Sequence, residues 1–184
     1  IYFSVDKVDT NAARAFDTVY HPSIIQPTLL YWQRTGDPAL TALFGEWLFS
    51  YLLFRDNPQR AEYPRVFKPV FEQIARESGQ PISFFEEMAT RTAPQFLTGA
   101  MTGIDWGQYK IVGFTSTFDQ NVASLTMAKL IKDLYPDVKI VFGGANYDGE
   151  MGLEYCRAVP LIDHVVVGEG EVTFPALVTH ILSG

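Results

Sequence analysis

The chain has 184 residues, of which 47% are hydrophobic and 14% aromatic, so it can bury a substantial core and is not expected to be disordered. Its formal net charge of −7 argues against nucleic acid or an anionic membrane as the main partner. The single cysteine, Cys156, excludes an intrachain disulfide and any cysteine-ligated cluster built by this chain alone, and it fits a cytoplasmic protein.

The first part of the chain, residues 1–107, is predicted to be rich in helix and to begin with a short strand at residues 1–5. A helix over 37–56 begins at an Asp-Pro pair and is apolar nearly all round, which predicts burial on several sides, but it is too short an apolar run to span a bilayer. A second helix over 58–79 contains two prolines and is expected to be kinked or broken. A third, over 83–101, begins with a serine and a glutamate at capping-box spacing.

The second part, residues 108–184, changes to short β-rich runs. Three of them, 110–115, 138–143 and 164–168, recur at intervals of roughly 26 residues, the length of a compact βα unit. They are continuously apolar, which predicts parallel strands covered on both faces by helical crossovers. The predicted fold class is therefore α/β: a Rossmann-like parallel sheet with helical crossovers, preceded by a helix-rich N-terminal region.

The crossovers also have recognisable ends. The first is predicted to begin at Thr117, because Gln120 follows it at capping-box spacing, and to end before Pro136. A shorter helix is expected after Gly152, and a last helix over 173–182 follows the third strand. These crossovers leave the carboxyl ends of the strands as the place where loops gather.

The carboxyl ends of the three strands carry polar residues and glycines, in segments 115–121, 143–146 and 168–171. Ligands of open parallel sheets bind at this edge. The segments hold hydroxyls, an amide and glycines but no lysine or arginine, and the chain has no phosphate-binding loop and no complete G-x-G-x-x-G pattern, which argues against a nucleotide-dependent enzyme. A large, mostly uncharged ligand held by main chain and hydroxyls fits better.

Each of these signals also has a purely structural explanation. Gly143 and Gly144 are typical of a tight turn between a strand and a helix. The hydroxyls that follow Phe114 can cap a helix, and Glu169 or Glu171 can favour a following helix N-terminus. The occurrence of such signals at three successive strand ends is what favours a ligand site.

Two segments, VGFTSTFDQNVASLTMAKLIKDLYPDVKIVFGGANYDGEMG and VPLIDHVVVGEGEVTFPALV, resemble the cobalamin-binding domain of cobalamin-dependent radical S-adenosylmethionine enzymes. The subgroup that they resemble modifies peptides, often as C-methyltransferases. The shared pattern is a G-F-S/T strand end, Q-x-x-x-S-L-x-x-A on a helix, I-V-F-G-G-A-N/C and G-E-G-E. The resemblance is good over residues 110–184, patchy over 37–55, where FGEWLFSYLLF is similar to an upstream segment of that subgroup, and poor elsewhere.

The resemblance implies a cobalamin site in which glycines bring main chain against the corrin ring and hydroxyls contact the nucleotide tail. It places the cofactor-binding residues at Thr115, Ser116, Thr117, Phe118, Gln120, Ser124, Leu125, Gly143, Gly144, Ala145, Asn146, Gly168, Glu169 and Gly170. No catalytic residue and no metal ligand is assigned in this chain. The difficult chemistry would belong to the cofactor, which the protein orients.

Two features of related proteins are absent. The D-x-H-x-x-G motif that donates a histidine to cobalt in other cobalamin proteins is missing, and none of His21, His164 and His180 has that spacing, so the resemblance implies base-off cobalamin without a histidine ligand. The C-x-x-x-C-x-x-C motif of the radical domain cannot be present in a chain with one cysteine. We therefore expect S-adenosylmethionine and a [4Fe–4S] cluster only in a missing C-terminal domain, this chain alone to be non-catalytic, and the chain to be a fragment of a longer enzyme or a stand-alone binder.

In the full-length protein the resemblance implies methyl transfer to a peptide, with the radical domain and a precursor peptide as partners. A different class stays open, in which the chain is a non-catalytic Rossmann-like ligand-sensing or interaction domain whose aromatic N-terminal part binds a partner. The aromatic residues of interest there are Trp32, Trp47, Phe84 and Phe85, with core packing as their default role. The segment 21–30 is expected near the lower face of the corrin ring.

Overall fold

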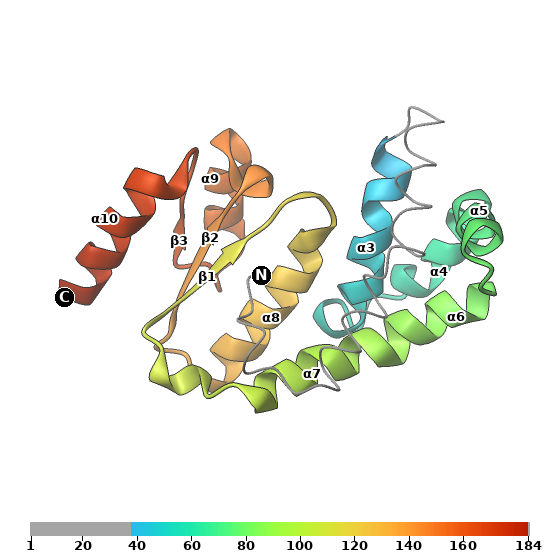
Figure 1. Cartoon of the computed structure of the whole chain (residues 1–184), viewed down its shortest axis with the longest axis horizontal. Helices are drawn as coiled ribbons and strands as arrows, with labels where there is room; N and C mark the ends of the chain where they lie inside the picture. The colour runs from blue at the N-terminus through green and yellow to red at the C-terminus, as the bar shows by residue number, and fades with distance from the viewer. Residues whose placement is uncertain (1–37, 184) are drawn as a thin grey trace. The chain divides into compact units, whose positions relative to one another are not determined.

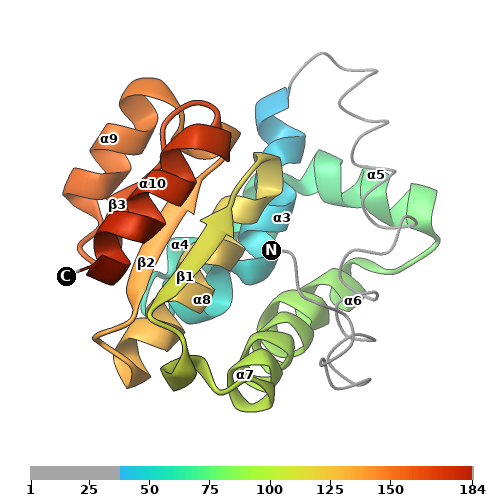
Figure 2. The same cartoon turned by 60° about the vertical axis from the view of Figure 1, so that its left-hand side comes forward.

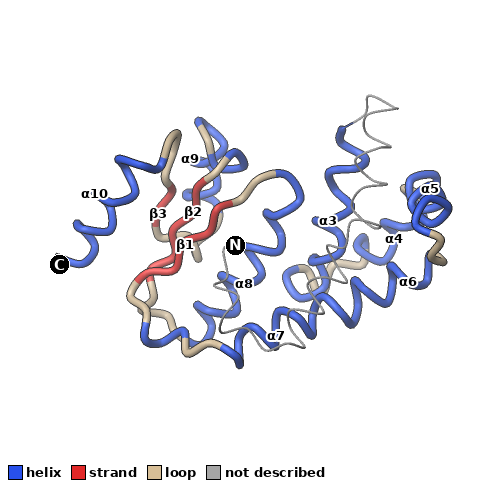
Figure 3. Tube along the Cα trace, viewed as in Figure 1, coloured by secondary structure: helices blue, strands red, loops and turns tan. Residues whose placement is uncertain are grey.

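The structure is a computed structural model that describes residues 38–183, except for the side chains of residues 38–43, Glu77 and Phe118. The described chain forms two compact units that divide between Ile104 and Asp105 (Figure 1). The first unit is helical, and the second contains the sheet (Figure 3). The expectations for residues 1–5, the segment 21–30, His21, Trp32 and the Asp37 cap lie outside the described residues.

The first unit is built from helices, as its apolar periodicity predicts. They are α3 (Pro38–Leu53), α4 (Gln59–Val66), α5 (Lys68–Ser78), α6 (Ile82–Glu87) and α7 (Ala93–Gly103), with a π-helical segment, η2 (Met88–Thr92), between the last two. The core of this unit is aromatic: the ring of Phe71 is fully buried and contacts Phe44 and Trp47 edge-on, with centroids 5.4 and 4.9 Å away. Trp47 and Phe85 are buried parts of this core, so both have the packing role that is the default for aromatic residues.

The break expected in the second helical segment is present, whereas one predicted cap in this unit is wrong. The second helical segment is broken at Phe67, which separates α4 from α5, and Pro69 lies in the first turn of α5. The expected capping box at Ser83 does not form, because α6 begins one residue earlier and its N-cap position is Pro81. Pro81 is already extended, with φ −70° and ψ 156°, and this conformation sets the start of the helix without a side-chain cap.

The second unit contains the predicted parallel sheet. Its strands are β1 (Ile111–Thr115), β2 (Lys139–Gly143) and β3 (His164–Val165), paired in the order β1-β2-β3. The helices are α8 (Asn121–Leu134), α9 (Gly149–Ala158) and α10 (Gly170–Ser183), with single turns η3 (Trp106–Gln108), η4 (Phe118–Gln120) and η5 (Ala145–Tyr147). The α/β class predicted from the sequence is confirmed.

The sequence predicts the start of the first crossover correctly but overestimates the length of β3. The capping box of Thr117 and Gln120 is formed, with the Thr117 N–H donating to Gln120 Oε1 at 3.1 Å. The third strand is shorter than predicted. The Val166 N–H still donates to the Phe142 carbonyl at 2.8 Å, but Gly168 then adopts φ +72° and turns the chain away from the sheet.

The two faces of the sheet are covered unequally. Phe114 and Phe142 stack on the face toward α8 and α9, with ring centroids 5.0 Å apart, and Tyr147 packs on Phe142 at 4.7 Å. All three rings are buried. The amide of Asn121 ties this face together, because it accepts from the Tyr147 hydroxyl at 2.6 Å and donates to that of Tyr155 at 2.7 Å. Helix α10 lies over the opposite face (Figure 2).

The amino edge of the sheet is held by Asp163. Its Oδ2 accepts from the Ile140 N–H at 2.7 Å and from Lys132 Nζ at 2.8 Å, while Lys139 Nζ lies 3.5 Å from Oδ1. Partial burial by itself raises the pKa of this carboxyl, but the hydrogen bond from Ile140 and the two lysines outweigh it, so the pKa of Asp163 lies below its ordinary value. The carboxylate form is therefore the one that stabilises the fold.

This depressed pKa gives a pH-dependent stability. The contribution is complete above the unfolded-state pKa of about 4 and is lost as the pH falls through the lower folded-state value. We expect Asp163→Asn to lower the free energy of unfolding at pH 7 and to differ less from the wild type as the solution becomes acidic. Urea unfolding between pH 7 and pH 3 measures this, and Asp133→Asn, which removes an exposed i,i+4 ion pair, is the control that keeps the wild-type pH profile.

Candidate functional site

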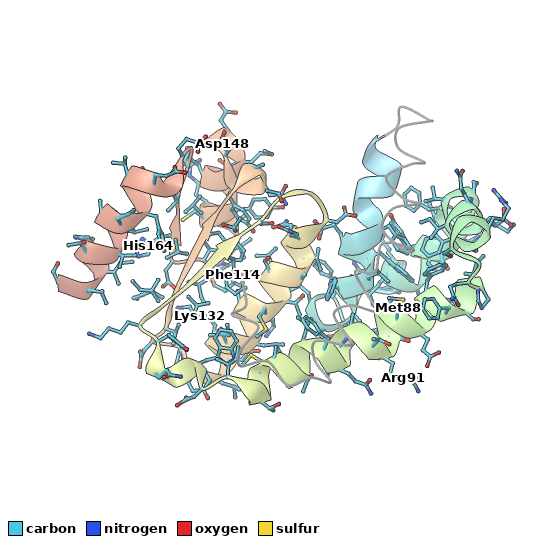
Figure 4. The ribbon with its side chains drawn as sticks, viewed as in Figure 1. Met88, Arg91, Phe114, Lys132, Asp148 and His164 are labelled. Atoms are coloured by element: carbon cyan, nitrogen blue, oxygen red, sulfur yellow. The ribbon has the colours of Figure 1, made fainter. Side chains whose placement is uncertain are left out.

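The three loops at the carboxyl edge of the sheet lie together, as the sequence predicts for parallel strands. Thr115 and Gly143, the last residues of β1 and β2, are partners in the ladder. The Ser116 N–H continues that ladder by donating to the Gly143 carbonyl at 2.9 Å. The loop after β3 joins them, because the Gly168 N–H donates to Asp148 Oδ1, in the loop after β2, at 2.9 Å. Figure 4 shows Asp148 at this edge, close to where α9 and α10 begin.

Gly144 is a glycine because two loops meet there. It adopts φ +89°, and a Cβ at this position would lie 2.7 Å from the Ser116 carbonyl oxygen and 3.0 Å from its nitrogen. Both neighbours are main chain and cannot move aside. Gly144 therefore allows the loops after β1 and β2 to approach each other closely. This packing explains the glycine without a ligand.

Several of the predicted polar residues hydrogen-bond to one another. Ser116 is fully buried; its carbonyl accepts from the Asn146 N–H at 3.1 Å, and its hydroxyl accepts from Asn146 Nδ2 at 3.0 Å. Thr117 and Gln120 are joined in the capping box. These four side chains fix the shape of the loops, and the hydroxyl hydrogen of Ser116 can still be donated elsewhere.

The opposite, α10-facing side of the sheet has an exposed strip, formed by Gly113 and Thr115 of β1. Both residues are exposed although a helix lies over this face. A Cβ at Gly113 would meet only the ring of Phe174, at 3.8 Å, which is ordinary contact. Helix α10 is rich in apolar residues yet has no buried residue, and Phe174 remains 38% exposed. A helix packed tightly on a sheet buries a stripe of its side chains, so α10 covers this face of the sheet only loosely.

The loop after β3 extends this exposed strip. Gly168 has φ +72°, and nothing lies within 4 Å of the position of a Cβ there. Glu169 is exposed. Gly170 begins α10, and a Cβ there would lie 4.0 Å from the side chains of Val166 and Phe174. Gly143 lies between the strip and Val166. A Cβ at Gly143 would lie 3.4 Å from the Val166 carbonyl oxygen. Main chain is therefore the accessible surface at this end of the α10 face.

Ser124 and Leu125 lie elsewhere, in the first turns of α8 on the other face of the sheet. Both are buried, Leu125 to 7% exposure and Ser124 completely. The Ser124 hydroxyl has no hydrogen-bond partner among the described residues. Within the predicted set, these two residues are thus separated by the sheet from Thr115 and its neighbours.

The described histidines and acidic residues make no metal site. No group of three or more His, Cys, Asp or Glu side chains within residues 38–183 is placed to hold a metal ion. His164 begins β3 and pairs with Val141 in the middle of β2, and His180 is in the last turn of α10. Neither lies at the carboxyl edge. No helix in the described part of the chain has the length and hydrophobicity needed to cross a bilayer.

The comparison with protein families gives a match that covers most of the second unit. Residues 102–178 match the model of the B12 binding domain. The matched range contains all three strands, both crossovers and every predicted cofactor-binding residue. B12 is cobalamin, so the match supports cobalamin as the ligand of this part of the chain.

A relative that is named as a methyltransferase matches a similar share of the chain. An uncharacterized methyltransferase of Pyrococcus horikoshii is 38% identical over 76 residues, which are 40% of this chain and 16% of the relative. The chain thus spans about one sixth of the length of this curated relative. No solved structure gives a significant match.

Sequence reasoning missed two residues of this edge. Phe174 lies against the strip from α10, and Asp148 connects two loops. An aromatic residue in an amphipathic helix and an aspartate at a helix start each have an ordinary local explanation, so the sequence alone carries no signal for these contacts.

Gly144 offers a direct test of the joint between the two loops. Gly144→Ala should lower the free energy of unfolding by at least about 2 kcal/mol, because the left-handed backbone and the contact with Ser116 both oppose a side chain. Gly170→Ala is the matched control and should change it by no more than about 0.5 kcal/mol, since its Cβ would have room. Urea unfolding followed by circular dichroism measures both, and equal effects would show that the close approach is unimportant.

Ser124 gives a second test, which asks whether its buried hydroxyl makes a hydrogen bond that stabilises the fold. Because its buried hydroxyl lacks a partner, Ser124→Ala should leave the free energy of unfolding unchanged or raise it by up to about 1 kcal/mol. A clear loss of stability would mean that the hydroxyl is bonded in solution. The matched control is Thr126→Val, which removes a hydroxyl of the same helix that donates to the Val122 carbonyl at 2.7 Å and should be destabilising.

Proposed function

We propose that the second unit binds cobalamin at the carboxyl edge of the sheet, with the nucleotide tail on the α10 face. The observation that carries this proposal is the exposed strip at Gly113 and Thr115, next to a helix with no buried residue. A small residue in a strand creates room for a ligand that approaches the main chain. The family match over residues 102–178 supports cobalamin as that ligand.

The residues present fit such a cofactor. Gly143 and Gly168 offer main chain to a flat ring, and Thr115 offers an exposed hydroxyl to the tail. Ser116, Thr117, Gln120 and Asn146 hold these loops in shape through their mutual hydrogen bonds, and Gly144, Ala145 and Gly170 set their paths. Ser124 and Leu125 support the strand ends from the far face.

Cobalt without a histidine ligand is part of the same proposal. Neither His164 nor His180 lies at the carboxyl edge, where the ring would rest, and no group of three or more metal-ligating side chains within residues 38–183 is placed to hold a metal ion. Base-off cobalamin would be held by the loops at the carboxyl edge and by the exposed residues Gly113 and Thr115 on the α10 face. When bound, cobalamin supplies a cobalt centre that can carry a methyl group, while this chain binds and orients it.

For the full-length protein we propose methyl transfer of the radical S-adenosylmethionine type, with a peptide as substrate. The methyltransferase name of the Pyrococcus horikoshii relative supports the transfer, and the motifs shared with the peptide-modifying subgroup support the rest. The [4Fe–4S] cluster and S-adenosylmethionine would belong to a separate radical domain. A three-cysteine motif in the coding region downstream of Gly184 is expected, and its absence would contradict this part of the proposal.

Cobalamin binding is tested by titrating the protein with hydroxocobalamin and following the visible spectrum and retention of the pigment in gel filtration. The wild type should retain the cofactor. Gly113→Ala and Gly113→Val should weaken binding in that order, the valine by at least about tenfold, because side chains then occupy the strip.

The same variants should fold normally. Valine is favourable in a strand, and the space above Gly113 admits a Cβ, so the free energy of unfolding should change by less than about 1 kcal/mol. Thr179→Val, at an exposed position of α10, is the control that should bind as the wild type does. Unaltered binding by Gly113→Val would place the cofactor elsewhere.

A further inference from the structure

One carboxylate oxygen connects two loops that are distant in the sequence. Asp148 Oδ1 accepts from the N–H of Gly149, the first residue of α9, at 2.9 Å. It also accepts from the N–H of Gly168, in the loop between β3 and α10, at 2.9 Å. The same side chain therefore caps a helix and holds Gly168, which lies 20 residues further along the chain.

The loop depends on this bond because little else holds it. After Val166 the chain leaves the sheet, and Val167, Gly168 and Glu169 are all exposed. Gly168 adopts a left-handed conformation with no atom near its Cβ position, so side-chain packing does not select that conformation. In the described chain, the bond to Asp148 joins this loop to another element, and an anionic acceptor makes it stronger than a neutral one would.

We propose that Asp148 is a positioning residue that fixes the main chain of Gly168 against the cobalamin ring. The inference rests on the proposed function, because the loop is one of the surfaces offered to the cofactor. Holding the loop in its bound shape before the ligand arrives reduces the ordering cost of binding. Asp148 itself does not contact the cofactor in this proposal; it acts through Gly168.

The two roles of Asp148 can be separated by substitution. Serine is among the preferred helix N-cap residues, so Asp148→Ser keeps the cap of α9, but its shorter side chain does not reach Gly168. Asp148→Asn keeps an oxygen at the Oδ1 position and can make both bonds. Glu150→Ser, at an exposed position in the first turn of α9, is the matched control.

The experiment uses the full chain and two measurements. Amide hydrogen exchange without ligand should be about tenfold faster at Gly168 in Asp148→Ser than in the wild type, and near normal in Asp148→Asn and Glu150→Ser. Hydroxocobalamin titration should show about tenfold weaker binding for Asp148→Ser, with most of the affinity restored in Asp148→Asn. A purely structural cap would predict no difference between serine and asparagine.

Each outcome has a defined meaning. If the wild type binds hydroxocobalamin and Asp148→Ser binds it equally well, the positioning role is overturned while the proposed function stands. Slow exchange at Gly168 in Asp148→Ser would also overturn it. If the wild type fails to bind, the proposed function falls, and the role of Asp148 toward a cofactor falls with it.

Discussion

The second unit depends on the approach of two main-chain segments at Ser116 and Gly144. The Ser116 N–H continues the β1–β2 ladder, its carbonyl accepts from Asn146, and Gly144 passes within contact of its peptide. A side chain at Gly144 would force these loops apart. Because both loops leave from neighbouring strands, their separation decides whether the carboxyl edge presents one continuous surface or two unconnected turns.

The architecture of this unit was predictable because it follows from short-range patterns. Continuous apolar runs at regular spacing identify parallel strands, and the Thr117–Gln120 capping box identifies the start of a crossover. The same motif failed at Ser83, where the fixed geometry of Pro81 starts the helix earlier. A local signal predicts structure only where no neighbouring residue imposes a stronger constraint. The length of β3 was overestimated because the turn at Gly168 is held by a bond to a residue that periodicity does not reveal.

The sequence predicted which loops form the candidate site, but not which of their residues pack against the fold and which are exposed to a ligand. Gly144 and Gly113 are alike in the sequence, yet Gly144 lies against main chain and Gly113 faces a partly covered space. The distinction depends on which face of the sheet each residue occupies and on what lies opposite, and both are tertiary facts. Ser124 illustrates the same limit, because its motif places it near the strand ends while the sheet separates it from the α10 face.

Helix α10 has a consequence beyond the site itself. Its apolar side chains are left partly in water, with Val172 81% and Leu182 51% exposed. Such surface favours non-specific self-association, and whatever covers the helix removes part of it from solvent. The protein is therefore expected to be most prone to aggregate while this helix is uncovered, so the occupancy of the helix surface would govern its colloidal behaviour.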